Sequence, residues 1–68
     1  MSKITLKAAR VNAGLTQKQA AEALGISNST LVKWENGKAA PRVEKIDALC
    51  ALYGTNYDNL NFLPNNPL

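Results

Sequence analysis

The sequence predicts an all-α fold of five helices. Apolar residues recur every three or four positions, the spacing that gathers them on one face of a helix. No segment shows the apolar–polar alternation of a half-buried strand. A glycine follows each of the first four helix-like segments, where a residue in the left-handed conformation commonly ends a helix. These glycines are Gly14, Gly25, Gly37 and Gly54.

The first two helices are expected over about residues 5–13 and 16–24. Thr16 is well suited as the N-cap of the second helix, and Gln19, three positions later, completes a capping-box pattern. Only the short turn 25–27 separates this helix from the next one. A turn of this length sets two helices at a steep mutual angle.

The third helix is expected over residues 28–36. Ser27 is its natural N-cap, and Ile26 can pack on Leu31, the fourth helical residue, as a hydrophobic staple. On a helical wheel Leu31 and Trp34 fall on one side, so both are expected to anchor the helix in the core. Trp34 is therefore expected to be a core residue and not a ligand-stacking one.

The opposite side of the third helix carries short polar groups, one lysine and one valine. Its members are Asn28, Ser29, Val32, Lys33 and Asn36. Asparagine can pair with an adenine edge, lysine can donate to guanine, and valine can contact a thymine methyl group, so this mixture suits the floor of a DNA major groove. The alternative is an ordinary solvated helix face, although such faces are usually rich in glutamate and this one has no acid.

Pro41 precedes a fourth helix whose apolar face consists of Val43, Ile46, Leu49, Cys50, Leu52 and Tyr53. A short fifth helix is expected over residues 57–62, with Asn56 as its cap. Residues 63–68 contain two prolines and two asparagines and are expected to be irregular, so the prediction is one domain, 1–62, followed by a tail. Three apolar residues either close the core or form an interface; they are Phe62, Leu63 and Leu68.

A set of residues between positions 4 and 62 matches a known pattern. Its members are Gln17, Ala20, Ala21, Leu24, Gly25, Ile26 and Leu31, the run Trp34-Glu35-Asn36-Gly37, Pro41, and the segment Tyr57-Asp58-Asn59-Leu60. The sequence thereby resembles the helix-turn-helix domain of the phage repressor and Cro family, also called the Xre type or lambda-repressor-like family. The resemblance implies a sequence-specific transcription regulator that binds double-stranded DNA as a homodimer, on near-palindromic operators with half-sites ~34 Å apart.

The resemblance also implies roles for single residues. Base edges are expected to be read by Asn28, Ser29, Val32 and Lys33, and the sugar-phosphate backbone to be held by Thr16, Gln17, Asn36, Lys38 and Arg42. For Thr16 the alternative is a capping role alone, and Lys18 is expected to be a solvated lysine. Arg10, on the apolar side of the first helix, and Glu35 are expected to form an ion pair that fixes the angle of the third helix.

Charge is distributed unevenly along the chain. Residues 1–42 carry seven lysines and arginines against two glutamates, a net charge of +5, whereas residues 43–68 carry one lysine against three acids, a net charge of −2. This division is typical of a protein with one face for a polyanion. The alternative is ordinary solvated surface charge.

Composition excludes several classes of site. The chain has no histidine and a single cysteine, so neither an internal disulfide nor a Cys/His zinc site can form. Cys50 is expected to be a buried apolar residue, since no histidine is present to activate it. We expect no enzymatic activity, cofactor, metal or small-molecule ligand.

The sequence also lacks an apolar run near the ~20 residues of a membrane span and lacks a signal-peptide pattern. We therefore expect a cytoplasmic protein, of a bacterial or phage-infected cell, without membrane contact. The alternative to DNA binding is an antitoxin-like or bridging module that uses the same fold to hold a protein partner.

Overall fold

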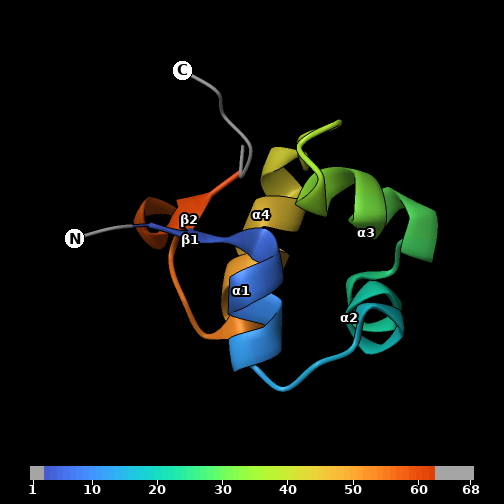
Figure 1. Ribbon diagram of the computed structural model, residues 1–68, viewed down its shortest axis with the longest axis horizontal. Coiled ribbons are helices and arrows are strands. Elements are labelled where there is room, and N and C mark those ends of the chain that lie inside the picture. The colour runs from blue at the N-terminus through green and yellow to red at the C-terminus, as the bar shows by residue number, and fades with distance from the viewer. Residues whose placement is uncertain (1–2, 63–68) are drawn as a thin grey trace.

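Four α-helices make up most of residues 3–62, the part of the chain that the computed structural model describes (Figure 1). They are α1 (Leu6–Asn12), α2 (Gln17–Leu24), α3 (Asn28–Glu35) and α4 (Val43–Tyr53). One 3-10 turn, η1, follows α4, and two short strands flank the helical part; these elements are η1 (Tyr57–Asn59), β1 (Ile4–Thr5) and β2 (Leu60–Asn61). The prediction of a mainly helical fold is confirmed, but with four α-helices in place of five.

The starts of α2 and α3 are capped as predicted. Thr16 and Gln19 form a reciprocal capping box, in which Thr16 Oγ1 accepts the Gln19 N–H at 3.1 Å and Gln19 Oε1 accepts the Thr16 N–H at 2.9 Å. Ser27 Oγ accepts the N–H of Thr30 at 3.1 Å at the start of α3. These bonds satisfy donors that the helices themselves leave unpaired, so both helices begin where the local side-chain chemistry favours a start.

The buried core lies among all four helices and β2. Its apolar members are Leu6, Ala9, Ala20, Ala21, Leu24, Leu31, Trp34, Leu49, Tyr53 and Leu60. Helix α2 packs against both α3 and α4, and its two buried alanines leave room for this close packing. Trp34 lies in the core as predicted, and Ile26 packs against the same cluster as Leu31.

The fifth helix predicted over residues 57–62 is wrong. Its first half is the single turn η1, and Asn56 before it makes no side-chain cap hydrogen bond. Its second half continues into β2, which pairs in parallel with β1 so that Ile4 lies opposite Leu60 (Figure 1). This pairing accompanies the burial of Leu60 in the core, and the long-range contact outweighs the local helical pattern. Strands of two residues are too short to show a period in the sequence, which is why no strand was predicted.

Four of the six residues assigned to the apolar face of α4 are less buried than predicted, namely Val43, Ile46, Cys50 and Leu52. Val43 is 75% exposed, because the first turn of α4 lies outside the core, with Arg42 and Glu44 exposed beside it. Cys50 is half-buried instead of buried. This partial burial raises the pKa of the Cys50 thiol, with a further contribution from the negative charge of Asp47.

Phe62 lies at the end of the described region and packs against the core. Its ring also contacts that of Tyr57, with the ring centroids 5.6 Å apart. Phe62 therefore helps to close the core, the first of the two roles predicted for it. Leu63, Leu68 and the irregular tail predicted over residues 63–68 lie outside the described residues.

Candidate nucleic-acid interface

The turn between α2 and α3 is closed by its own backbone hydrogen bonds. Gly25 adopts the left-handed conformation, with φ of 70°. Its N–H donates to the Glu22 carbonyl at 3.2 Å, and the N–H of Ile26 donates to the Ala21 carbonyl at 3.0 Å. These two bonds form a Schellman motif. Because Ile26 also packs against the core, the turn holds α3 at a set angle to α2.

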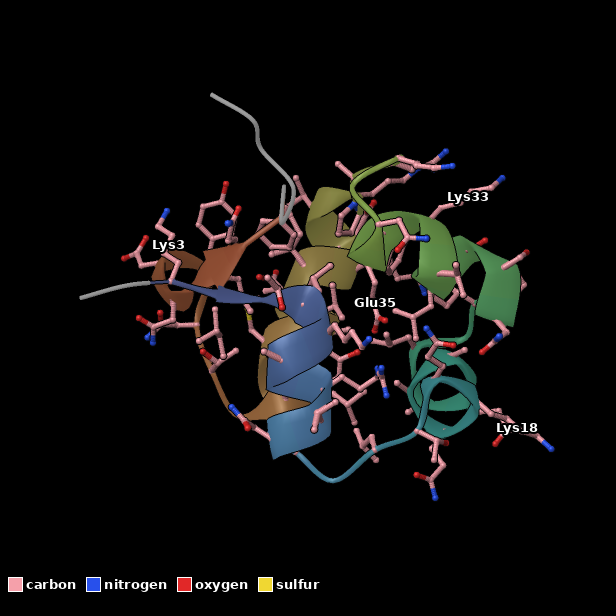
Figure 2. All side chains as sticks on the ribbon, viewed as in Figure 1. Lys3, Lys18, Lys33 and Glu35 are labelled. Carbon is pink, nitrogen blue, oxygen red and sulfur yellow. The ribbon has the colours of Figure 1, made fainter. Side chains whose placement is uncertain are left out.

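A buried ion pair links α1 to α3. Arg10 Nε donates to Glu35 Oε2 at 2.7 Å, and Arg10 Nη2 lies 3.4 Å from Glu35 Oε1. The two side chains are only 9% and 3% exposed. Arg10 Nη1 also donates to the carbonyl of Leu15, in the loop between α1 and α2, at 2.9 Å. The Arg10–Glu35 pair that the resemblance implied is thus present, and Figure 2 shows Glu35 in the interior between α1 and the α2–α3 pair.

Gln17 extends this network to α2. Its Nε2 donates to Glu35 Oε1 at 3.0 Å. A carboxylate only accepts hydrogen bonds, so the nitrogen of the amide must face Glu35. That nitrogen carries two N–H groups, which leaves one of them for an outside acceptor such as a phosphate oxygen. Gln17 therefore has a structural role that no local pattern of the sequence indicates, and this role is compatible with the phosphate contact expected of it.

Three of the four side chains expected to read base edges are exposed on α3, namely Asn28, Ser29 and Lys33. The fourth, Val32, is half-buried. Figure 2 shows Lys33 projecting outward from α3, whereas Leu31 is fully buried, as the helical wheel predicts. We call Asn28, Ser29, Val32 and Lys33 the reading stripe; their contact with DNA remains a prediction.

The N-cap of α3 also restrains hydroxyl groups at the start of this helix. Ser27 Oγ lies 3.2 Å from Ser29 Oγ and 2.9 Å from Thr30 Oγ1. A hydroxyl group donates one hydrogen bond and accepts others, so Ser29 retains capacity for a second partner while it contacts Ser27. The first exposed turn of α3 is therefore both ordered and able to bind a polar ligand.

The side chains expected to hold phosphates lie at the ends of helices around α3. Thr16 is the N-cap of α2, Asn36 is the C-cap of α3, and Arg42 is the N-cap of α4. These three and Lys38 are exposed, whereas Gln17 is half-buried. The Thr16 hydroxyl accepts a capping bond but can still donate one, so the capping and phosphate roles are compatible.

Positive side chains project from the α2–α3 side of the molecule. Lys18 and Lys33 both extend outward there, while Lys3 lies at the opposite end (Figure 2). Lys18 is exposed, as expected of a solvated lysine. The cations and the reading stripe thus share a side of the protein that an anionic polymer could contact.

A family model described as Helix-turn-helix matches residues 6–60, from the start of α1 to the start of β2. The chain belongs to this helix-turn-helix family. The Xre-type resemblance seen in the sequence is thus confirmed, and the family is one of DNA-binding transcription regulators.

The helix-turn-helix domain is also similar to part of a curated protein. The HTH-type transcriptional activator BcrR of Enterococcus faecalis is 34% identical over 55 residues. The aligned part is 81% of this chain but 27% of that relative, so the chain spans about a quarter of the relative's length. No solved structure matches the chain at a significant level.

Two further observations concern residues 3–62 of the helix-turn-helix domain. None of the helices in this region is long and apolar enough to cross a membrane. The same region contains no group of three or more histidine, cysteine, aspartate or glutamate side chains that could hold a metal ion.

Two polar contacts of the helix-turn-helix domain had no signal in the sequence. Lys45 Nζ, on α4, donates to the carbonyl of Leu24 at 2.7 Å. The two residues are 21 positions apart, and neither a capping rule nor a helical wheel relates such distant positions. The bond between Gln17 and Glu35 escaped prediction for the same reason.

Proposed function

We propose that this helix-turn-helix domain binds double-stranded DNA in a sequence-specific manner, as a transcription regulator of the phage repressor or Cro type. The reading stripe is the observation that supports this most. Exposed hydrogen-bonding groups lie on a helix whose opposite side is anchored in the core and whose start is capped. An ordered helix with such a face is suited to enter the major groove.

The reading stripe supplies complementary groups for several base edges. The Asn28 amide can both donate to and accept from adenine, and the Lys33 ammonium can donate to O6 and N7 of guanine. Val32 can contact a thymine methyl group, and the Ser29 hydroxyl can pair with either a donor or an acceptor. These contacts would carry sequence preference.

Contacts to phosphate would fix the register of α3 on the duplex. The side chains proposed for this role are Thr16, Gln17, Asn36, Lys38 and Arg42. Free backbone N–H groups at the start of α2 favour an anion at the same place. The Arg10–Glu35 pair and the Gln17 bond to it keep α1, α2 and α3 together, so base and phosphate contacts can form at the same time.

We further propose that the domain binds as a homodimer to a near-palindromic operator, with half-sites ~34 Å apart. The Enterococcus faecalis relative is named a transcriptional activator. Recognition of DNA by this type of domain is therefore compatible with either repression or activation of transcription.

The test is binding of the full chain to a duplex selected from a random library and to a scrambled duplex, at four salt concentrations. If about three to five cations of each protomer approach the duplex, drawn from Lys33, Lys38, Arg42, Lys7 and Lys18, log K for a dimer should fall against log salt with a slope of about −5 to −9. Lys38→Ala should make the slope shallower by about one per protomer and leave the order of preferred sequences unchanged.

Identical binding curves for the selected and scrambled duplexes would contradict sequence-specific regulation, even if both duplexes bind. The absence of duplex binding would favour the antitoxin-like or bridging module instead.

A further inference from the structure

Lys45 makes a polar contact between α4 and the end of α2. Its Nζ donates a 2.7 Å hydrogen bond to the carbonyl of Leu24, the last residue of α2. The ammonium group also lies near the turn that leads to α3: its Nζ is 3.8 Å from the position that a Cβ at residue 25 would occupy, where the chain has Gly25. Lys45 is half-buried, so its charge is directed toward the protein.

The backbone of the same residue holds the start of α4. The N–H of Lys45 donates to the carbonyl of Arg42, the N-cap residue of α4, at 2.9 Å. The Arg42 side chain makes no capping bond and is exposed. Lys45 thus connects the end of α2 to a residue that we propose contacts phosphate.

Electrostatics make this connection stronger than a hydrogen bond between neutral groups. The last carbonyls of a helix lack intrahelical partners and carry partial negative charge, which a cation stabilises. Helix α2 has no basic residue in its own last turn, so Lys45 supplies the missing cation from α4. Bonds donated by an ammonium group are also stronger than neutral ones.

We infer that Lys45 is a positioning residue for DNA binding. It keeps the start of α4, and Arg42 with it, in a fixed position relative to α2 and to the turn that leads to the reading stripe. The Arg42 phosphate contact and the base contacts of α3 can then form together, while Lys45 itself does not touch DNA. This inference rests on the proposed function, since it requires Arg42 to contact phosphate.

A double-mutant cycle of Lys45→Met and Arg42→Ala tests this role. Methionine keeps most of the length and the apolar part of the side chain but removes the ammonium group. Binding of the full chain to the selected duplex is measured against salt, at a temperature at which circular dichroism shows every variant folded. We expect Lys45→Met to weaken binding about tenfold, the loss of roughly one charge-assisted contact. The salt slope should become shallower by about one per protomer.

The cycle separates positioning from a general effect on folding. If Lys45 acts through Arg42, Lys45→Met should add little to the loss caused by Arg42→Ala, and Lys45→Arg should retain most of the affinity. Lys3→Met is the matched control, because it removes the same charge at the opposite end of the molecule (Figure 2) and should leave the slope close to that of the wild type. If Lys45→Met does not fold, Lys45→Gln takes its place in the cycle.

Two outcomes overturn the inference alone. In both, the wild type prefers the selected duplex. In the first, Lys45→Met binds like Lys3→Met. In the second, the losses caused by Lys45→Met and Arg42→Ala are additive. A wild type that binds both duplexes equally overturns the proposed function, and the positioning role with it.

Discussion

The helix-turn-helix unit, residues 16–36, and the terminal segment 57–62 are held in place by different kinds of contact. The first has two side-chain caps, a Schellman turn and a buried network around Glu35. The second has one 3-10 turn, a strand pair two residues long and apolar contacts. The unit that carries the reading stripe therefore has several independent restraints, whereas the terminal segment depends on contacts with the rest of the chain.

The largest effect is expected from removing one partner of the buried ion pair in the helix-turn-helix unit. Glu35→Ala leaves Arg10 buried without its carboxylate and Gln17 without its acceptor. We expect the free energy of unfolding to fall by about 3–5 kcal/mol. Urea unfolding followed by circular dichroism measures this change.

The matched control replaces both charged residues by apolar ones. The double variant Arg10→Met with Glu35→Leu leaves no buried charge unpaired and should be much less destabilised than Glu35→Ala. A Glu35→Ala protein with wild-type stability would contradict the role assigned to this network.

A pair of leucines compares the two regions directly. Leu31 in α3 and Leu60 in β2 are 0% and 2% exposed. Leu31→Ala should cost about 2–5 kcal/mol, which approaches the whole stability of a domain this small. Leu60→Ala should cost less, because a short strand pair can relax around the cavity more easily than a capped helix.

Thermal unfolding of both leucine variants measures the difference. Equal losses would mean that the strand pair is packed as firmly as α3. A Leu31→Ala protein that melts near the wild-type temperature would contradict the placement of Leu31 on the buried side of α3.

The next effect concerns DNA binding by the reading stripe. If Lys33 reads a guanine, Lys33→Ala should cost about 1–3 kcal/mol of binding free energy on the preferred duplex and relax the preference at one base position. Lys3→Ala, at the opposite end of the molecule, is the control and should leave the base preferences intact. An equal loss on all duplexes would instead assign Lys33 to phosphate.

The smallest effect is expected at Tyr53 on α4, which packs against both α2 and η1. Among the described residues its buried hydroxyl finds no hydrogen-bond partner. Tyr53→Phe should therefore leave the stability at pH 7 unchanged or raise it by up to about 1 kcal/mol. A clear loss of stability at this pH would indicate that the hydroxyl is satisfied after all.

The same variant predicts a dependence on pH. Burial raises the pKa of Tyr53 to about 12, with a smaller contribution from Glu35 and an opposing one from Arg10. Tyrosine in the unfolded chain ionises near ~10. Ionisation of Tyr53 therefore leaves the free energy of unfolding unchanged below that pH and lowers it as the pH rises toward 12. Tyr53→Phe has no group to ionise there and lacks this loss. Urea unfolding at pH 7 and pH 11 checks this, and parallel losses in the two proteins would contradict it.

The sequence by itself determined where α2 and α3 start and which side of α3 is buried. A capping side chain and its target N–H are three residues apart, and a helical wheel relates positions on one helix, so short segments contain all the information needed. Thr16, Ser27 and Leu31 behave as predicted for this reason. The outward positions of Asn28 and Lys33 follow from the same wheel.

Only the tertiary structure decided the features that join distant parts of the chain. Leu60 is in a strand because β1 lies beside it, and Val43 is exposed because the first turn of α4 lies outside the core. The bonds from Gln17 to Glu35 and from Lys45 to Leu24 likewise depend on how the helices pack. The free energy of such contacts comes from groups that are far apart in sequence, so no short segment specifies them and they form only when the whole domain has folded.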